Sequence, residues 1–237
     1  DPVDPSTGLF FFKETDLTLT GIMPVSITRT YRTLEQGVGP FGIGVSFNYD
    51  LMLLSAGNQA LWYILPDGGR YLFSLQPDNT YTNSSYPFLR GVIVTVNPDG
   101  TYQMRFKDGM LYTFDSNGRL IEQRNRNNDS INITRDSNGS IIAITEPKGR
   151  SLQFTNGPGF FTDRGWVYLI TSITDPIGRR VEYNYDSEGR LIEVKNSEGG
   201  ITRYTYDSGM RITSIINPKG ITVVTNQYDG AGRVSQQ

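Results

Sequence analysis

The stretch Tyr185-Asp186-Ser187-Glu188-Gly189-Arg190-Leu191 decides the fold of this chain, because close relatives of it recur along the sequence. Two of these relatives are Phe114-Asp115-Ser116-Asn117-Gly118-Arg119-Leu120 and Tyr228-Asp229-Gly230-Ala231-Gly232-Arg233-Val234. A structural unit that returns along a sequence is typical of a repeat architecture, whereas a catalytic site usually appears as one irregular cluster.

Residue type explains why these stretches turn. An Asp at the first position accepts a hydrogen bond from the backbone two residues on, and a Gly at the fourth position adopts a left-handed backbone. We therefore expect the repeat turns to be built on Asp115 and Gly118, Asp136 and Gly139, Asp186 and Gly189, and Asp229 and Gly232. The turn at Asp207 has Met210 in the glycine position, so we expect that turn to shift onto Gly209.

A second series of turns lies between the first, and the residues between turns alternate in character. The second series is Glu146-Pro147-Lys148-Gly149, Asp175-Pro176-Ile177-Gly178, Asn196-Ser197-Glu198-Gly199 and Asn217-Pro218-Lys219-Gly220. In Arg180-Val181-Glu182-Tyr183-Asn184-Tyr185 the apolar or aromatic side chains stand two apart, which is the period of a strand. The sequence thus predicts an all-β fold of stacked antiparallel β-hairpins that form a curved strip or a solenoid-like sheet.

The regular period does not cover the whole chain. Residues 1–98 show strand and turn signals without the repeat, so we expect an N-terminal β segment over 1–98 and a hairpin array over 99–237. The stretch from Thr155 to Gly165 interrupts the period and is expected to be an inserted loop. We expect no helix.

Composition excludes several classes of function. The 237 residues carry a net charge of −2 with acids and bases mixed, so there is no basic stripe to bind nucleic acid. The chain has no cysteine and no histidine, which removes disulfides, thiolate chemistry, ordinary zinc sites and histidine-based triads. Apolar runs fall far short of the roughly 20 residues of a membrane helix. We expect no metal, no cofactor and no membrane span.

The N-terminal segment and the later Tyr-Asp turns together resemble the Rhs/YD-repeat family. The segment contains, in order, Asp1-Pro2-Val3-Asp4-Pro5-Ser6-Thr7-Gly8, Glu14-Thr15-Asp16-Leu17, Ile27-Thr28-Arg29-Thr30-Tyr31, Gly39-Pro40-Phe41-Gly42 and Tyr49-Asp50-Leu51. These stretches are similar to the N-terminal segment of the family, and the turns are similar to its namesake repeat. The resemblance covers nearly the whole chain.

The resemblance implies a structural role. Proteins of this family wind long β-strips into hollow shells, which enclose a C-terminal cargo in bacterial toxins and serve adhesion in animal relatives. We therefore expect a non-enzymatic scaffold, secreted or at the cell surface, that forms part of a shell or of a self-assembling surface structure. Its exposed strand edges are expected to pair with further copies or with missing C-terminal repeats. An enclosed polypeptide or a glycan is a further expected partner.

The alternative is a secreted adhesion module that binds a glycan or a protein. Phe160, Phe161 and Trp166 lie outside the repeat pattern and are the candidate contacts for such a ligand. The repeated tyrosines are instead expected to stack in cross-strand ladders that hold the hairpins in register; they are Tyr183, Tyr185, Tyr204 and Tyr206.

Charged residues of the repeat have structural interpretations. Arg119, Arg190 and Arg233 each follow a turn glycine, and we expect each to pair with a nearby Asp rather than to bind an acidic partner. Asp175 is expected to be an ordinary turn residue, although the family has a self-cleaving Asp-Pro-x-Gly element. Carboxylates such as Glu182 are scattered, and no catalytic residue is expected.

Overall fold

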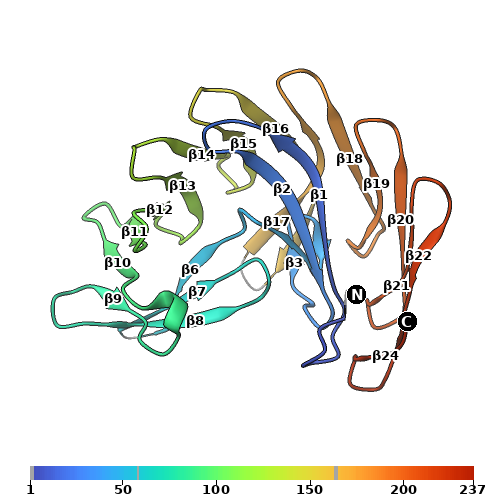
Figure 1. The fold of residues 1–237 in the computed structure, drawn as a ribbon, viewed down its shortest axis with the longest axis horizontal. Helices are drawn as coiled ribbons and strands as arrows, with labels where there is room; N and C mark the ends of the chain where they lie inside the picture. The colour runs from blue at the N-terminus through green and yellow to red at the C-terminus, as the bar shows by residue number, and fades with distance from the viewer. Residues whose placement is uncertain (1–2, 58, 163–164) are drawn as a thin grey trace.

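Antiparallel strands make up nearly all of the computed structural model, which describes residues 3–57, 59–162 and 165–237 (Figure 1). Within this part of the chain the only helix is a short 3₁₀ turn, η1 (Pro87–Leu89). The predicted all-β fold, a curved strip of antiparallel hairpins, is confirmed.

The N-terminal part forms a small separate sheet that lies within the curve of the strip (Figure 1). It is a three-stranded antiparallel sheet of β1 (Phe11–Leu19), β2 (Val25–Arg32) and β5 (Val45–Phe47). A minimal hairpin of β3 (Val38–Gly39) and β4 (Gly42–Ile43) is attached to it. Alternate residues of β2 are buried, as the alternation of apolar and polar residues in this stretch requires.

The strip itself runs from β6 to β22, and each strand pairs with the next one in sequence. Its first strands are β6 (Met52–Ser55), β7 (Ala60–Ile64), β8 (Arg70–Leu75), β9 (Tyr81–Thr82), β10 (Ile93–Val96), β11 (Tyr102–Arg105), β12 (Leu111–Phe114) and β13 (Leu120–Arg124). It continues with β14 (Ser130–Arg135), β15 (Ile141–Thr145), β16 (Ser151–Thr162), β17 (Gly165–Thr174), β18 (Arg180–Tyr185), β19 (Leu191–Lys195), β20 (Ile201–Tyr206), β21 (Ile212–Ile216) and β22 (Thr222–Thr225). A final hairpin pairs β23 (Gln227–Tyr228) with β24 (Val234–Gln236).

The strip curls so tightly at its start that β6 meets the turn between β12 and β13. The Leu53 amide donates to the Gly118 carbonyl at 2.8 Å, and the Leu120 amide donates to the Leu51 carbonyl at 3.3 Å. A side chain at position 118 would place its Cβ 1.7 Å from the Leu53 oxygen, so only glycine permits this contact. Among the described residues no strand ladder joins β22 back to β6, and the later strands form an open arc (Figure 1).

One face of the strip packs against the N-terminal sheet, and both contribute to a single hydrophobic core. Val181, Tyr183, Val194 and Tyr204 alternate with exposed or half-buried residues along their strands and are almost wholly buried. The predicted division of the chain at residue 98 stays a prediction. The strip passes through this position from β10 to β11 without a break.

The expected loop from Thr155 to Gly165 is wrong, because these residues extend the hairpin of β16 and β17. Gly159 pairs with Tyr168, and Phe161 pairs with Trp166. Two irregularities in register, at Thr155/Asn156 and Asn156/Gly159, absorb the glycine-rich part of the sequence that suggested a loop. Residues 163 and 164 lie outside the described part of the chain.

The turn at Asp207 is not shifted, contrary to expectation. The Met210 amide donates to the Asp207 carbonyl at 3.1 Å, and Met210 itself takes the left-handed backbone with φ of 61°. The reason is that Arg211 must stay four residues after Asp207, with which it forms an ion pair at 2.7 Å. The ion pair therefore fixes the position of the turn in the sequence, and Met210 adopts an unfavourable left-handed backbone.

Replacing Met210 with glycine is expected to stabilise the protein. Relief of the left-handed strain outweighs the extra freedom that glycine has in the unfolded chain, which leaves a gain of about 0.5–1 kcal/mol in the free energy of unfolding. Urea denaturation of Met210→Gly measures this. The matched control is Gly199→Ala, where φ is 86° and nothing lies within 4 Å of the new Cβ. This control should lose about 1 kcal/mol, and a loss in both variants would contradict the account.

Candidate functional site

From β14 onward, a repeated tether joins successive hairpins of the strip. The Tyr185 hydroxyl donates to the Ile170 carbonyl at 2.6 Å, and the Tyr206 hydroxyl donates to the Leu191 carbonyl at 2.7 Å. Each bond spans 15 residues, so the donor and the acceptor are separated by the same length of chain in both repeats. Burial raises the pKa of Tyr206 well above its usual range, so the hydroxyl stays a proton donor.

The Asp of each Tyr-Asp turn binds both the turn backbone and an arginine. Asp186 Oδ1 accepts hydrogen bonds from the amides of Glu188 and Arg190, each at 3.0 Å. Its Oδ2 accepts from Arg190 Nε at 2.6 Å, and the Arg190 guanidinium lies 5.4 Å from the centre of the Tyr206 ring. The arginine thus connects the Asp of one turn with the tether tyrosine of the next repeat.

The same arrangement recurs at the next turn. Arg211 binds Asp207 and lies 4.8 Å from the centre of the Tyr228 ring, and the Tyr228 hydroxyl donates to the Ile212 carbonyl at 2.6 Å. Burial disfavours the ionised Asp207, but hydrogen bonds from Arg211 and from the turn backbone outweigh it and lower the pKa of this carboxyl. We call this set of Tyr, Asp and Arg the repeat clamp.

The repeat clamp corrects the predicted tyrosine ladders. Tyr183 pairs across the sheet with Val194, and Tyr204 pairs with Ile215, so these tyrosines do not stack on one another. Their rings instead contact the N-terminal sheet, because Tyr183 and Tyr204 project from the inner face while Tyr185 projects toward the preceding repeat.

Two of the tether positions carry other residues. Arg135 donates from Nε and Nη2 to the Leu120 carbonyl at 3.4 and 3.2 Å, and Asn156 donates from Nδ2 to the Ile141 carbonyl at 3.0 Å. Both bonds again span 15 residues. The repeat therefore conserves the tether as a hydrogen bond while the donor changes from a hydroxyl to a guanidinium or an amide.

The expected pairing of Arg119 with a nearby Asp is wrong, whereas Arg190 and Arg233 bind Asp186 at 2.6 Å and Asp229 at 2.8 Å. No ion pair joins Arg119 to any acid in the part of the chain that the structure describes. The physical reason is a competing placement: the Arg119 guanidinium lies over Gly139 of the next turn, near the guanidinium of Arg135.

A buried ion pair connects the N-terminal sheet to the strip. Arg29 of β2 binds Asp16 of β1 through two hydrogen bonds of 2.6 and 2.8 Å, and both side chains are less than 5% exposed. The Tyr183 hydroxyl donates to Asp16 at 2.9 Å, and the Arg29 guanidinium reaches the Tyr204 hydroxyl at 3.4 Å. Burial, together with the Asp16 charge, raises the pKa of Tyr183. Charges and hydroxyls therefore satisfy one another where water is excluded.

Ring packing and a backbone hydrogen bond complete the attachment of the N-terminal segment to the strip. The Phe41 ring is fully buried and packs edge-on against Tyr183 at 4.9 Å. The Ile43 amide donates to the Gly189 carbonyl at 3.1 Å, and a Cβ on Gly42 would come within 2.5 Å of that same oxygen. The stretch Gly39-Pro40-Phe41-Gly42 thus packs closely against the Tyr-Asp turn that contains Gly189.

Sequence reasoning missed Asp16 and Arg29 as functional residues. Both stand in stretches that carried the family resemblance, Glu14-Thr15-Asp16-Leu17 and Ile27-Thr28-Arg29-Thr30-Tyr31. A charged residue at an inward position of an alternating strand is the signal that could have found them. Arg29 alternates with Ile27 and Tyr31, which are both buried.

The structure brings the predicted aromatic contacts together only in part. The Phe161 and Trp166 rings are 74% and 55% exposed, with their centres 5.7 Å apart. Phe160 lies on the other side of β16, where its ring packs beneath Gly189. The role of these residues as ligand contacts stays a prediction.

The carboxylates of Glu182 and Asp175 are used in an ion pair and in a turn. Glu182 accepts from Lys195 Nζ at 3.1 Å, and Asp175 accepts from the Ile177 and Arg179 amides in an ordinary turn. Within the described residues no cluster of acids has the arrangement of a metal site. No helix described by the structure is long and apolar enough to cross a membrane.

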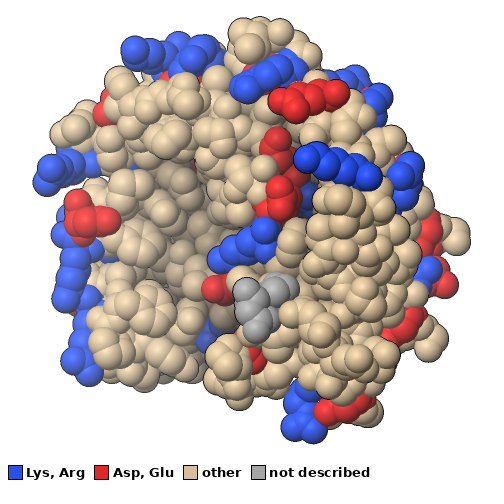
Figure 2. All heavy atoms as spheres, turned by 45° about the vertical axis from the view of Figure 1, so that its right-hand side comes forward, with Lys and Arg blue, Asp and Glu red and all other residues tan. Residues whose placement is uncertain are grey.

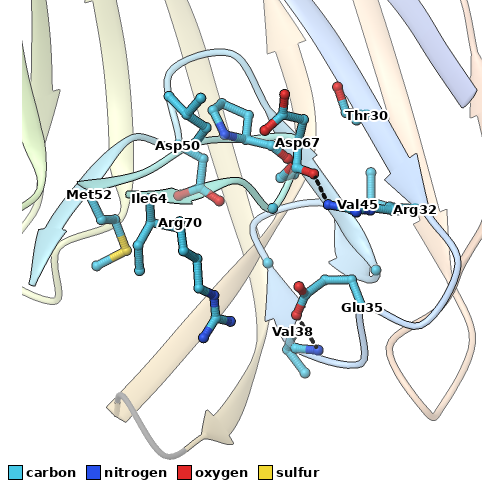
Figure 3. A pocket seen from close by; sticks show the side chains of 17 residues that line it. Thr30, Arg32, Glu35, Val38, Val45, Asp50, Met52, Ile64, Asp67 and Arg70 are labelled. Atoms are coloured by element: carbon cyan, nitrogen blue, oxygen red, sulfur yellow. Dashed lines mark hydrogen bonds between the residues drawn. The ribbon is translucent and has the colours of Figure 1, made fainter. Parts of the chain in front are cut away.

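Two adjoining cavities open between the N-terminal segment and the strip. The smaller, of about 110 Å³, is lined by Thr30, Asp67 and neighbouring residues, and Arg32 donates to the Asp67 carbonyl beside it (Figure 3). The larger, of about 410 Å³, shares Asp50 and Arg70 with it and extends to β17. A space-filling view shows a hollow whose walls are mostly uncharged, with both basic and acidic residues around it (Figure 2).

Comparison with protein families finds two matches in this chain. Residues 1–73 match a family described as "Domain of unknown function (DUF6531)". Residues 169–201 and 185–223 match the family described as "RHS Repeat", over strands that carry the repeat clamp.

Curated relatives are much longer than this chain. It is 26% identical to the double-stranded DNA deaminase toxin A of Burkholderia cenocepacia (strain H111) over 99% of this chain and 17% of the relative. It is 29% identical to the tRNA nuclease WapA of Bacillus subtilis (strain 168) over 94% of this chain and 10% of the relative. Human Teneurin-4 is 28% identical over 63% of this chain and 4% of that protein. The chain thus spans less than a fifth of these relatives.

Solved structures of toxin complexes show a partial likeness. The crystal structure of TcdB2-TccC3 without the hypervariable C-terminal region is 14% identical, with a TM-score of 0.38 over 92% of this chain and 12% of that one.

The buried ion pair yields a stability prediction. Arg29→Met leaves Asp16 buried without its counter-charge, so we expect a loss of about 3–5 kcal/mol in the free energy of unfolding. The double variant Asp16→Leu/Arg29→Met should recover most of that loss, because no uncompensated charge remains. Thermal and urea denaturation measure both.

A matched control uses an exposed pair of the strip. Arg203→Met breaks the ion pair with Glu193 at 2.7 Å, where the side chains are 52% and 28% exposed. Its cost should stay below about 1 kcal/mol. Equal losses for Arg29→Met and Arg203→Met would contradict a special role for the buried pair.

Proposed function

Because the chain belongs to the Rhs/YD-repeat family, we propose that it is a structural segment of a shell wall or extended surface assembly and carries no catalysis of its own. The observation that carries this is the repeat clamp, which uses the polar residues of each turn to join hairpins. These polar residues therefore have a structural role. The proposed location is outside the cell or at its surface.

The named activities of the relatives fit this division of labour. Two relatives are named as a DNA deaminase toxin and a tRNA nuclease, and this chain spans 17% and 10% of them. We assign such activities to parts of those proteins outside the matched segment. In this proposal the matched segment supplies a wall, and an enclosed polypeptide is one of its partners.

The last strand offers a place where such a wall can grow. Ile221 and Val223 are 56% and 54% exposed beside this edge. The Asn226 amide donates inward to Thr213, so by strand alternation the amide of the preceding Thr225 points outward. An outward row of amides and apolar side chains pairs readily with a further strand, from another copy or from further repeats.

A second candidate function is adhesion to a glycan or protein, which the exposed Phe161 and Trp166 rings favour. Trp166→Ala should abolish binding on a glycan or protein array without changing the melting temperature, because the ring is more than half exposed. Binding that persists in Trp166→Ala would remove this candidate.

Edge pairing is tested by a proline at the outward amide. Thr225→Pro removes a donor that the strip itself does not use, so the fold should persist while self-association is lost. Analytical ultracentrifugation and electron microscopy over a range of concentrations measure the assembly. The control is Ser197→Pro, because the equivalent positions of sibling turns hold Pro147, Pro176 and Pro218. A chain that remains monomeric, or that assembles equally well with Thr225→Pro, would contradict the edge mechanism.

A further inference from the structure

The larger cavity lies where the series of tether tyrosines is interrupted. Arg135 and Asn156 hold the two tether positions that line it, and Trp166 and Tyr168 form its wall on β17. Tyrosine at these positions would extend the regular repeat into this space. The interruption therefore creates both the volume of about 410 Å³ and its polar lining.

Arg119 is diverted into the same cavity. In five other turns, from both series, the arginine pairs with the acid four residues earlier; these are Arg150, Arg179, Arg190, Arg211 and Arg233. Arg119 lines the cavity instead, with its guanidinium over Gly139. A Cβ at that glycine would lie 1.5 Å from Arg119 Nη1, so glycine makes room for this placement.

The two arginines form a cationic wall. Arg135 uses some of its N–H groups on the carbonyls of Leu120 and Gly139, the latter at 2.9 Å. A guanidinium has five such donors, so others remain for a ligand. Burial lowers the pKa of Arg135, Asp50 opposes this shift, and the neighbouring Arg119 adds to it. An anion between the arginines would relieve that repulsion.

Asn156 supplies an acceptor that lacks a donor. Its Nδ2 binds the Ile141 carbonyl at 3.0 Å, whereas its Oδ1 is buried and accepts no hydrogen bond within the described structure. An unpaired buried acceptor is costly, so a ligand that brings a hydroxyl is favoured here. Beside it the Trp166 ring stacks on Tyr168 at 6.2 Å and leaves 55% of the Trp166 side chain exposed.

The charge of the whole cavity restricts the ligand further. Arg70, Arg119 and Arg135 face two acids, Glu35 and Asp50, which leaves one net positive charge. Arg70 extends past Asp50 with its guanidinium away from the strand (Figure 3). This balance suits a single carboxylate accompanied by hydroxyls, which can donate to the acidic part of the wall. A phosphate dianion would meet the two acids.

We propose that this cavity binds an acidic saccharide of the uronic-acid type. Its carboxylate lies between Arg119 and Arg135, a ring hydroxyl donates to Asn156 Oδ1, and a sugar face packs on Trp166. This deepens the second candidate function, adhesion to a glycan, by naming its site and ligand class. It does not depend on the scaffold function, because the residues involved are the ones that depart from the repeat clamp.

Isothermal titration calorimetry of the whole chain with digalacturonate tests the proposal. Arg119→Gln should weaken binding by about tenfold or more, since it removes a charge-assisted hydrogen bond. The dimethyl ester of the same disaccharide should bind as weakly as the variant does. The matched control is Arg190→Gln, which alters an ordinary clamp arginine and should leave the affinity unchanged.

A second variant restores the regular repeat. Arg135→Tyr supplies a hydroxyl for the Leu120 carbonyl and removes the charge, so the melting temperature should be kept while digalacturonate binding is lost. Absence of binding to the folded wild-type chain would overturn the proposal, as would equal weakening by Arg119→Gln and Arg190→Gln. Preferential binding of the acidic dipeptide Glu-Glu would also overturn it, by assigning the cavity to a peptide.

Discussion

From β14 onward the structure depends on a hydrogen bond that one hairpin donates to the main chain of the preceding hairpin. Strand pairing alone would leave two neighbouring hairpins free to slide or splay, because ladder bonds repeat along the strand. The bond from Tyr206 to the Leu191 carbonyl removes this freedom, and Arg190 adds a contact from the turn to the same ring. The tether thereby fixes the position of one hairpin relative to the next.

Alternation and turn chemistry made the strip predictable. Apolar residues at alternate positions, such as Val181 and Tyr183, predict the buried face of a strand, and Asp186 with Gly189 predicts a turn. Both predictions use only residues that are close together in the sequence. The role of the tyrosine hydroxyl was not predictable in this way. Its acceptor lies 15 residues earlier, and no local rule names it. Met210 shows the limit of a local rule, because an ion pair overrode the preference for glycine.

The attachment of the N-terminal sheet was still less accessible from sequence. Asp16 and Arg29 meet Tyr183 and Tyr204 across separations of 167 and 175 residues, which no periodicity encodes. The cavity was hidden for a related reason. Arg135 and Asn156 look like unremarkable strand residues until the structure shows that they take the place of the tether tyrosine.

These long separations have a consequence for how the protein reaches its native state. Closing so large a loop costs entropy before any contact rewards it, and proteins dominated by such contacts fold slowly. The ion pair of Asp16 and Arg29 cannot be sealed from water until β18 and β20 exist, which places it late on the folding pathway. During synthesis from the N-terminus, the first sheet is made well before β18 and β20. Its apolar face therefore stays exposed until these strands form, and an exposed apolar face of this kind is a binding site for chaperones.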